Sequence, residues 1–244
     1  MRRPNSSSKA PDAPRAVGWY VTGTDTGVGK TLASAALLHR LHAAGLRAVG
    51  MKPVASGCVR TDDGWRNEDA LRLQAASVPM PAYDAVNPYA LPSPTAPSLA
   101  AAEIGVRIDP ARLVAGYRAL AAQADAVVVE GVGGWAAPLD HGLEQADLVR
   151  ALALPVVLVV GLRLGCLNHA RLTERAISAD GLALVGWIAN RIDPAFRDAE
   201  AYLDLLAEAL PAPRLGVLPY RSSPSAEDAA HALALPPGVI LPTV

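Results

Sequence analysis

Runs of apolar residues without polar alternation recur along this chain. Residues 126–129 are Ala-Val-Val-Val, and residues 155–160 are Pro-Val-Val-Leu-Val-Val. A strand with one wet face alternates apolar and polar residues, whereas a strand of a parallel sheet between two helix layers is apolar throughout. Both runs therefore predict strands that are buried on both faces. Further strands are expected at residues 16–22, 46–51, 182–188 and 214–218.

Helical patterns separate the expected strands. A helix over residues 110–124 is indicated by Asp109 as its N-cap and by Pro110 in its first turn. Other helices are expected at residues 30–44, 68–76, 98–103, 167–179 and 198–209. Residues 52–67 are expected to form a loop. The proline-rich stretch 78–97 is expected to be irregular over most of its length, because proline lacks a backbone N–H.

The alternation of strands and helices indicates an α/β fold, with a single doubly wound, mostly parallel β-sheet flanked by helices. No internal repeat, low-complexity block or linker divides the chain, so we expect residues 16–244 to form one domain. Residues 1–15 are rich in serine and proline and lack the apolar core of a secretory signal. We expect them to be a disordered tail.

Composition narrows the class of protein. Of the 244 residues, 51% are hydrophobic and 18% are charged, which is typical of a soluble globular protein. The formal net charge of -1 gives no electrostatic reason to expect nucleic acid or an anionic membrane as a partner. No apolar segment approaches the ~18 residues of a membrane span, and we expect a cytoplasmic protein. The cysteines and histidines show no metal-ligand spacing.

One stretch is typical of a phosphate-binding loop. Residues 23–31 are Gly-Thr-Asp-Thr-Gly-Val-Gly-Lys-Thr, between an expected strand and an expected helix. In that context backbone N–H groups point at an anion, Lys30 reaches the β/γ-phosphates, and the Thr31 hydroxyl binds Mg²⁺. The match to G-x-x-x-x-G-K-[ST] is imperfect, because Thr24 stands where the first glycine should be. The alternative is an ordinary strand-to-helix turn with a solvated lysine.

Besides the loop 23–31, Lys52 and Glu130 stand at the ends of expected strands, at the edge where an open parallel sheet binds ligands. Glu130 follows an apolar run, which suits a carboxylate that reaches Mg²⁺ beside the phosphates, although a helix N-cap is an alternative. Lys52 would hold an anionic substrate against the γ-phosphate, but a lysine at a strand end is usually solvated. Asp69 begins a helix, where the helix dipole favours an acid in any case.

Taken together, these segments resemble the dethiobiotin synthetase family. The similar segments are residues 23–31, 52–57 (Lys-Pro-Val-Ala-Ser-Gly), 66–70 (Arg-Asn-Glu-Asp-Ala), 129–135 (Val-Glu-Gly-Val-Gly-Gly-Trp), 164–170 and 186–190. They occur in order along most of the chain. The sequence GVGKT is shared with other ATPases of the same fold, whereas the combination of the first four segments is specific.

The resemblance implies a P-loop NTPase fold and an ATP- and Mg²⁺-dependent ring closure in biotin biosynthesis. The substrates would be 7,8-diaminononanoate, CO₂ and ATP, and the products dethiobiotin, ADP and phosphate. An amine captures CO₂ as a carbamate, the carbamate attacks the γ-phosphate to give a carbamoyl phosphate, and the second amine closes the cyclic urea. Such chemistry needs mainly positioning and charge neutralisation from the protein. The family also implies a homodimer with the substrate at its interface.

The resemblance also assigns roles to residues. Lys52 and Lys30 would be catalytic, Lys30 on the γ-phosphate and Lys52 on the carbamate and the transferred phosphoryl group. Thr31, Asp69 and Glu130 would hold Mg²⁺. The expected nucleotide-binding residues are Gly27, Val28, Gly29, Lys30, Thr31, Leu32, Asp69, Glu130, Gly131, Val132, Gly133, Asn190, Arg191, Pro219, Tyr220 and Arg221. The expected substrate-binding residues are Thr26, Ser56, Asn168 and Tyr202, the last two across the dimer interface.

Departures from the family pattern concern mainly the nucleotide. Gly27 stands where some relatives carry an acid, so any contact from that side chain is absent here. Tyr220 and Arg221 stand where relatives often have apolar residues, which leaves the nucleotide preference open. Asn190 is expected to read the adenine edge. The proline-rich residues 87–97 have no assigned role.

Three alternatives remain. A ParA/MinD-like ATPase switch shares the fold and GVGKT but carries a signature lysine where this chain has Asp25. An amidase-coupled ligase such as cobyrinate diamide synthase would need a glutaminase domain, for which 244 residues leave no room. A pure nucleotide-binding module would leave Lys52 and Glu130 unexplained.

Overall fold

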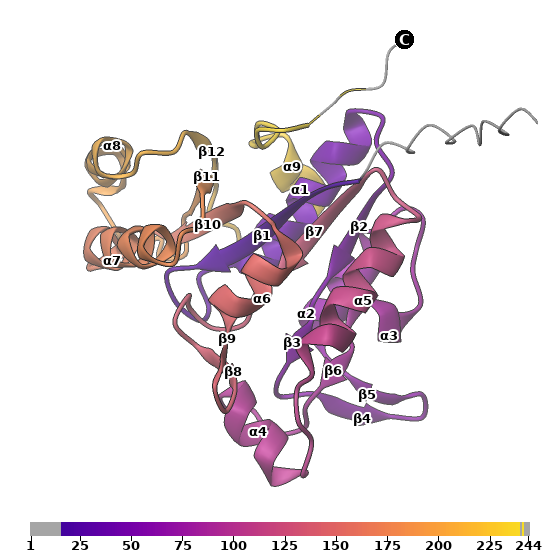
Figure 1. Ribbon diagram of the computed structural model, residues 1–244. Coiled ribbons are helices and arrows are strands. Elements are labelled where there is room, and N and C mark those ends of the chain that lie inside the picture. The colour runs from indigo at the N-terminus through magenta and orange to yellow at the C-terminus, as the bar shows by residue number, and fades with distance from the viewer. Residues whose placement is uncertain (1–15, 240, 242–244) are drawn as a thin grey trace, which may run out of the picture.

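Six parallel strands form the central sheet of the computed structural model, which describes residues 16–239 and residue 241. Their order is β12–β11–β10–β1–β7–β2, and every neighbouring pair is parallel (Figure 1). The strands are β1 (Val17–Gly23), β2 (Ala48–Met51), β7 (Ala126–Glu130), β10 (Val156–Gly161), β11 (Leu184–Asn190) and β12 (Arg214–Leu218). The predicted fold class and all six predicted strands are confirmed. The tail expected over residues 1–15 lies outside the described residues.

Helices connect these strands and cover the sheet. The helices that the sequence predicted are α1 (Lys30–Ala43), α2 (Glu68–Ala75), α4 (Pro97–Glu103), α5 (Pro110–Ala121), α7 (Cys166–Ala179) and α8 (Ala199–Ala209). The N-cap prediction for α5 is confirmed, because the Asp109 side chain accepts a hydrogen bond from the N–H of Ala111 at 2.8 Å. Within the described residues, the sequence missed α3 (Tyr83–Val86), α6 (Gln145–Leu152) and α9 (Ala226–Ala230).

The prediction of a plain loop over residues 52–67 is wrong. The short strands outside the central sheet are β3 (Val54–Ala55), β4 (Val59–Thr61), β5 (Gly64–Arg66), β6 (Tyr89–Ala90), β8 (Pro138–Asp140) and β9 (Leu143–Glu144). β4 and β5 form an antiparallel hairpin, and Asp63-Gly64, with Gly64 at φ +112°, is the local turn signal that was missed. β3 pairs with β6 of the proline-rich stretch, a segment far along the chain that no local pattern links to it.

The two faces of the sheet are both covered by helices. Because successive side chains of a strand point to opposite faces, Trp19 and Val21 of β1 pack with α1, α2 and α9, while Tyr20 packs on the other face with α5 and α6. Side chains of α7 and α8 cover that second face at β10 and β11. Figure 1 shows the two layers, with α5 and α6 on one side and α1 and α9 on the other. Double coverage explains why these strands lack polar alternation.

The parallel arrangement brings the carboxyl ends of all six strands to one edge of the sheet. The strand β7 is fully buried up to this edge, with Val127, Val128, Val129 and Glu130 all at 0% exposure. Burial of each valine side chain stabilises the fold by about 1.5–3 kcal/mol. Apolar packing of this strength can hold a buried carboxylate, Glu130, in one place at the sheet edge.

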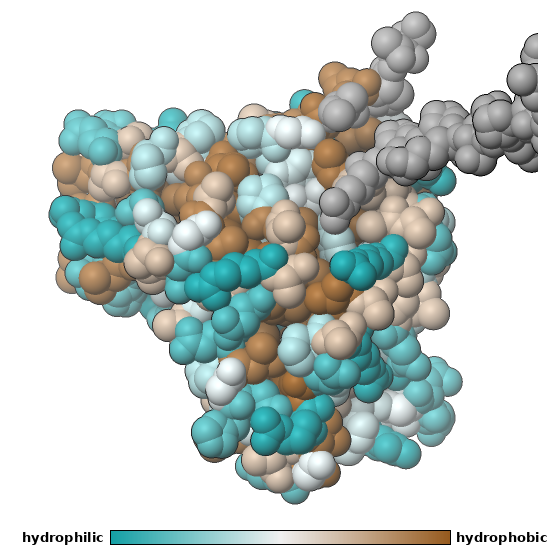
Figure 2. All heavy atoms as spheres, in the orientation of Figure 1, coloured by the Kyte–Doolittle hydropathy of each residue, from teal (hydrophilic) through white to brown (hydrophobic). Residues whose placement is uncertain are grey.

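Hydrophobic residues on the face shown in Figure 2 are interspersed with hydrophilic ones. In the part of the chain that the structure describes, no helix is long and apolar enough to cross a membrane.

Candidate active site

A cavity of about 840 Å³ lies at the carboxyl edge of the sheet. Its walls come from the loops after β1, β2 and β7, from the first turns of α1 and α2, and from the end of β11. The residues of this wall that the sequence predicted are Thr26, Gly27, Gly29, Lys30, Thr31, Leu32, Lys52, Ser56, Asp69, Glu130, Val132, Gly133 and Asn190. The fold therefore gathers residues from five separate segments around one space.

The loop between β1 and α1 has a backbone that only glycine accommodates easily. Gly27 and Gly29 have φ angles of +74° and +90°. Gly29 also lies against Asn190, where an added Cβ would come within 2.1 Å of the amide nitrogen. That amide donates a hydrogen bond to the carbonyl of Val28 at 3.0 Å. Asn190 therefore holds the loop from β11, a contact that the sequence did not predict.

Asp25, which stands where an ATPase switch would carry its signature lysine, is an internal anchor of the loop. Its carboxylate pairs with Arg163 at 2.6 Å and accepts the N–H of Thr26 at 2.7 Å. Its backbone carbonyl accepts a hydrogen bond from Lys30 Nζ at 2.9 Å, and the carbonyl of Gly133 accepts a second one at 2.6 Å. The Lys30 ammonium is thereby held over the loop, inside the cavity.

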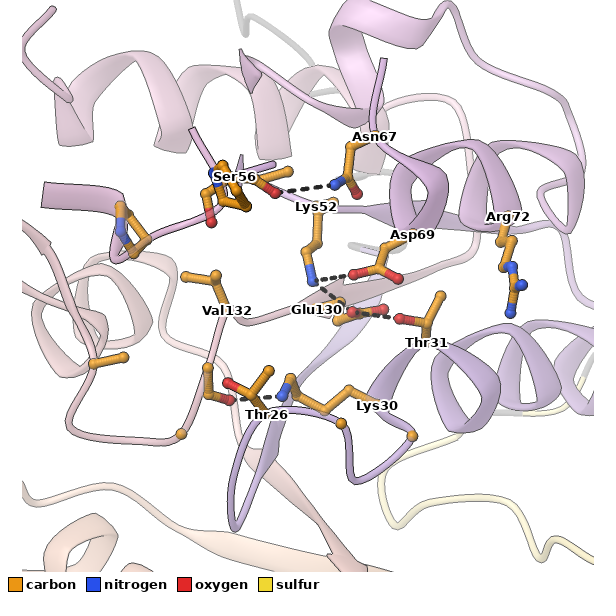
Figure 3. A pocket seen from close by; sticks show the side chains of 18 of the residues that line it. Thr26, Lys30, Thr31, Lys52, Ser56, Asn67, Asp69, Arg72, Glu130 and Val132 are labelled. Carbon is orange, nitrogen blue, oxygen red and sulfur yellow. Dashed lines mark hydrogen bonds and ion pairs between the residues drawn. The ribbon is translucent and has the colours of Figure 1, made fainter. Parts of the chain in front are cut away.

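Lys52 lies between two carboxylates (Figure 3). Its Nζ is 2.6 Å from Glu130 Oε1 and 3.2 Å from Asp69 Oδ2, and it also donates to the carbonyl of Gly131 at 3.0 Å. Burial acts to lower the pKa of Lys52, but Glu130 and Asp69 outweigh burial and the pKa is raised. Lys52 is therefore a buried, permanently charged ammonium rather than a solvated strand-end lysine.

Glu130 connects Lys52 to the phosphate-binding loop. Its Oε1 accepts a hydrogen bond from the Thr31 hydroxyl at 2.9 Å, while its buried Oε2 has no hydrogen-bond partner among the described residues. Burial acts to raise the pKa of Asp69, but Lys52 outweighs it and the pKa is lowered. Asp69, with its lowered pKa, the unpartnered Oε2 of Glu130 and the Thr31 hydroxyl are oxygen donors of the kind that Mg²⁺ prefers. These side chains therefore fit a Mg²⁺ ion.

A protein cage alone would not hold that ion. Across the described residues, no group of three or more His, Cys, Asp and Glu side chains is arranged to bind a metal. Mg²⁺ commonly takes only one or two carboxylates and completes its octahedron with water and substrate phosphates. Thr31, Asp69 and Glu130 could hold an ion of this second kind, together with substrate phosphates.

Asn67 is a site residue that the sequence reasoning missed. Its side chain caps α2 by accepting the N–H of Ala70 at 3.2 Å, and it donates to the carbonyl of Ser56 at 3.3 Å. Asn67 thereby ties the segment after β2 to the helix that carries Asp69. An asparagine directly before a helical pattern is an N-cap signal, so the sequence did contain the clue.

The proline-rich stretch, to which the sequence assigned no role, also contributes to the cavity. Pro94, Thr95, Ala96 and Pro97 line its wall, as does Arg72 of α2. These residues reach the site because β6 pairs with β3, directly after Lys52.

The remaining predicted residues lie outside this cavity. Val28 is a buried residue of the phosphate-binding loop, and the carbonyl of Gly131 accepts a hydrogen bond from Lys52. Pro219 and Arg221 line an adjoining space of about 270 Å³ that shares Leu32 with the main cavity. Tyr220 is 48% exposed, and Arg191 pairs with Glu200. Asn168 is exposed on α7, and Tyr202 of α8 packs against Phe196 with ring centroids 4.9 Å apart.

Comparison with known proteins gives close relatives. A family described as AAA domain matches residues 18–228. ATP-dependent dethiobiotin synthetase of Xanthomonas oryzae pv. oryzae (strain PXO99A) is 62% identical over 217 residues, which cover 89% of this chain and 96% of the relative. The enzyme of the same name from Xylella fastidiosa (strain 9a5c) is 64% identical over 202 residues, which cover 83% of this chain and 89% of the relative.

Solved structures share the fold at low identity. Chloroplast FtsY from Physcomitrella patens has a TM-score of 0.52 and 17% identity, covering 93% of this chain and 68% of that chain. The MinC:MinD cell division complex from Aquifex aeolicus has a TM-score of 0.51 and 14% identity, covering 85% of this chain and 83% of that chain. At such identities the likeness establishes the fold alone, so the similarity to MinD does not favour an ATPase switch.

Proposed function

This chain belongs to the family of ATP-dependent dethiobiotin synthetases, ligases of biotin biosynthesis, and on that premise we propose that its cavity closes the ring of 7,8-diaminononanoate with CO₂. The observation that carries the proposal is the pair of buried ammonium groups, Lys30 and Lys52, which face one cavity with carboxylates beside them. ATP activation of a small anion needs this combination of cations for the transferred phosphoryl group and carboxylates for a metal ion.

The proposed reaction proceeds in three steps. One amine of the diamine attacks CO₂ and loses a proton, which gives a carbamate. The carbamate oxygen attacks the γ-phosphorus, the bond to ADP breaks, and a carbamoyl phosphate forms. The second amine then attacks the carbonyl carbon, phosphate leaves, and loss of a proton completes the cyclic urea. The cavity would contribute orientation and charge neutralisation, because it brings the reacting groups together and shields them from water.

Lys52 would neutralise the carbamate and the phosphoryl group in transfer. The Lys52 side chain is only 4% exposed, and its raised pKa keeps the ammonium charged. It would therefore need no proton from water to neutralise an anion. A preorganised charge in a site of low dielectric stabilises a developing anion more strongly than the same charge in water. Thr26 and Ser56, which line the cavity on either side, would contact the reacting end of the diamine or the phosphates.

Thr31, Asp69 and Glu130 would hold Mg²⁺, which would neutralise charge on the β- and γ-phosphates. Lys30 would bind the β- and γ-phosphates, and the glycine-rich loop would surround the phosphates with its N–H groups. The adjoining space beside Leu32, Pro219 and Arg221 would receive the base. One amide hydrogen of Asn190 is engaged by the carbonyl of Val28, so base recognition by Asn190 would use its second amide hydrogen or its carbonyl oxygen.

Incubation with 7,8-diaminononanoate, labelled bicarbonate and MgATP tests the proposal. We expect label in an acid-stable cyclic urea, formed in a one-to-one ratio with ADP. A reaction that lacks ATP should give no acid-stable label, because it stops at the carbamate, which decomposes in acid. ADP release without labelled cyclic urea, or no reaction at all, would contradict the proposed substrates.

Nucleotide affinity should weaken at alkaline pH. Burial, together with the nearby Lys52, lowers the pKa of Lys30 from 10.5 to about 8. Lys30 in the free protein therefore loses its proton as the pH rises through about 8, and only about one tenth remains protonated at pH 9. We expect ADP to bind about tenfold more weakly at pH 9 than at pH 6.5, because binding must then include proton uptake.

Calorimetry with EDTA present measures this effect without a contribution from a metal ion. The matched variant is Lys30→Arg, since arginine stays protonated throughout this range and should remove most of the pH dependence. Equal ADP affinity of the wild type at both pH values would show that Lys30 keeps its charge.

We further propose a homodimer in which Asn168 and Tyr202 of one subunit contact the substrate of the other, as the family resemblance implies. Both residues lie outside the cavity of their own chain, on α7 and α8. A monomeric mass in analytical ultracentrifugation at assay concentration would contradict this arrangement. A cytoplasmic location remains a prediction.

A further inference from the structure

Both lysines of the site donate hydrogen bonds to the backbone of one loop, residues 131–135, which follows β7. The carbonyl of Gly131 accepts a hydrogen bond from Lys52 Nζ at 3.0 Å, and the carbonyl of Gly133 accepts one from Lys30 Nζ at 2.6 Å. A shift of this loop would therefore move the hydrogen-bond acceptors of both ammonium groups at once.

Gln145, the first residue of α6, forms hydrogen bonds with this loop and does not line the cavity itself. It is fully buried, and its Oε1 accepts hydrogen bonds from the Tyr20 hydroxyl at 2.7 Å and from the N–H of Val132 at 3.1 Å. Its Nε2 donates to the carbonyls of Gly134 at 2.5 Å and Trp135 at 3.2 Å. A primary amide offers two donors and two acceptor positions, so every hydrogen-bonding capacity of this side chain is used.

The surrounding residues are shaped to this amide. An added Cβ at Gly131 would lie 2.5 Å from Gln145 Oε1 and 2.8 Å from the Tyr20 hydroxyl, so the loop fits the pair only with glycine there. Burial, with the Glu130 charge as a second cause, raises the pKa of Tyr20 above its usual value. The tyrosine hydroxyl therefore keeps its proton and serves as the donor to Gln145.

We infer that Gln145, supported by Tyr20, is a positioning residue of the active site, which fixes the loop 131–135 and through it the ammonium groups of Lys30 and Lys52. An apolar side chain of equal size would fill the same core volume but leave the Tyr20 hydroxyl and the Val132 N–H unsatisfied. Buried polar groups without partners are costly, so the loop would shift to find others. The inference rests on the proposed roles of the two lysines.

The Gln145→Met variant of the full chain tests this role, because methionine keeps the volume and removes all four hydrogen bonds. Misplacement of reacting groups by 1 Å costs about 10²-fold in rate, so we expect turnover per nucleotide-binding site to fall about 10–100-fold. The affinity for a non-hydrolysable ATP analogue with an imido β–γ bridge should fall severalfold, since Lys30 is also displaced. Calorimetry gives both the number of sites and this affinity.

Ser77→Ala is the matched control for loss of a buried hydrogen bond. The Ser77 hydroxyl accepts the N–H of Gly50 at 2.9 Å and donates to the carbonyl of Leu73 at 2.7 Å, with no contact to the lysines. This variant should lose stability but keep wild-type turnover per site and wild-type analogue affinity. If Gln145→Met behaves in the same way, Gln145 only stabilises the fold and the inference is overturned.

Tyr20→Phe decides the question if Gln145→Met does not fold. It removes a single hydroxyl and should lower turnover per site by a few-fold, whereas unchanged turnover and analogue affinity would overturn the inference. The analogue affinity needs neither the diamine nor CO₂. A failure of the proposed ring closure would therefore appear in the wild type as missing cyclic urea, while the affinity difference between Gln145→Met and Ser77→Ala would still test the positioning role.

Discussion

The Lys52→Ala variant should close the ring about 10²–10³-fold more slowly than the wild type. This is the loss seen when one preorganised group that stabilises transition-state charge is removed. Lys30 does not replace Lys52, because its ammonium is held 2.6 Å from the carbonyl of Gly133, on the other side of Glu130 (Figure 3). Turnover is measured as labelled cyclic urea formed per minute, at a temperature where circular dichroism shows the variant folded.

The same substitution should also destabilise the fold. Lys52 and Glu130 have side-chain exposures of 4% and 0%, and breaking such a buried ion pair by removing one partner costs about 3–5 kcal/mol. Chemical denaturation measures this loss, and added Mg²⁺ should recover part of it by neutralising Glu130 again.

Arg47→Ala is the matched control for the loss of a cation, since Arg47 and Lys52 flank the same strand, β2. The pair of Arg47 with Asp125 is exposed, so this variant should lose little stability and keep its turnover. Wild-type turnover in Lys52→Ala would remove Lys52 from the mechanism.

The Glu130→Gln variant should require at least about 100-fold more Mg²⁺ for half-maximal turnover. Residues that only orient a metal ligand already contribute 10–100-fold to metal affinity, and Glu130 would be a ligand itself. Glutamine keeps the shape of the side chain and an acceptor for the Thr31 hydroxyl and for the Lys52 ammonium, and circular dichroism checks that the variant is folded. The measurement is a titration of turnover with Mg²⁺ at fixed ATP.

Glu68→Gln serves as the control for the removal of one negative charge. Glu68 is adjacent to Asp69 in sequence, but its side chain is 78% exposed and pairs with Arg72. This variant should keep the Mg²⁺ requirement of the wild type. An unchanged Mg²⁺ requirement in Glu130→Gln would exclude Glu130 as a metal ligand.

Much of the fold could be predicted because its signals are local. The strand β7 is a run of β-branched residues, and α5 begins at an Asp-Pro pair, so each is recognisable within a few positions. The hairpin of β4 and β5 was not predicted, although Asp63-Gly64 is a local signal for a hairpin turn. The pairing of β3 with β6 could not be found in the same way, because it joins segments separated by α2 and α3.

The site could be predicted only in part. The phosphate-binding loop carries Lys30 and Thr31 in one continuous motif, and Glu130 stands out after its apolar strand. For Lys52 and Asp69 the residue pattern alone was ambiguous, and the family resemblance supplied the functional interpretation. Their charge state depends on one another, since the ammonium of Lys52 lies 3.2 Å from Asp69 and 2.6 Å from Glu130.

The sequence by itself determined the chemistry that is available to this protein: the parallel sheet, the glycine-rich loop, two lysines and the acids at strand and helix ends. Local sterics and the periodicity of apolar residues are sufficient for that. Only the tertiary structure decided which groups hold one another, such as Asn190 on the loop, Asn67 between two segments, and Gln145 on residues 131–135. Hydrogen bonds between distant segments depend on distances of a few tenths of an ångström, and these exist only once the chain has packed.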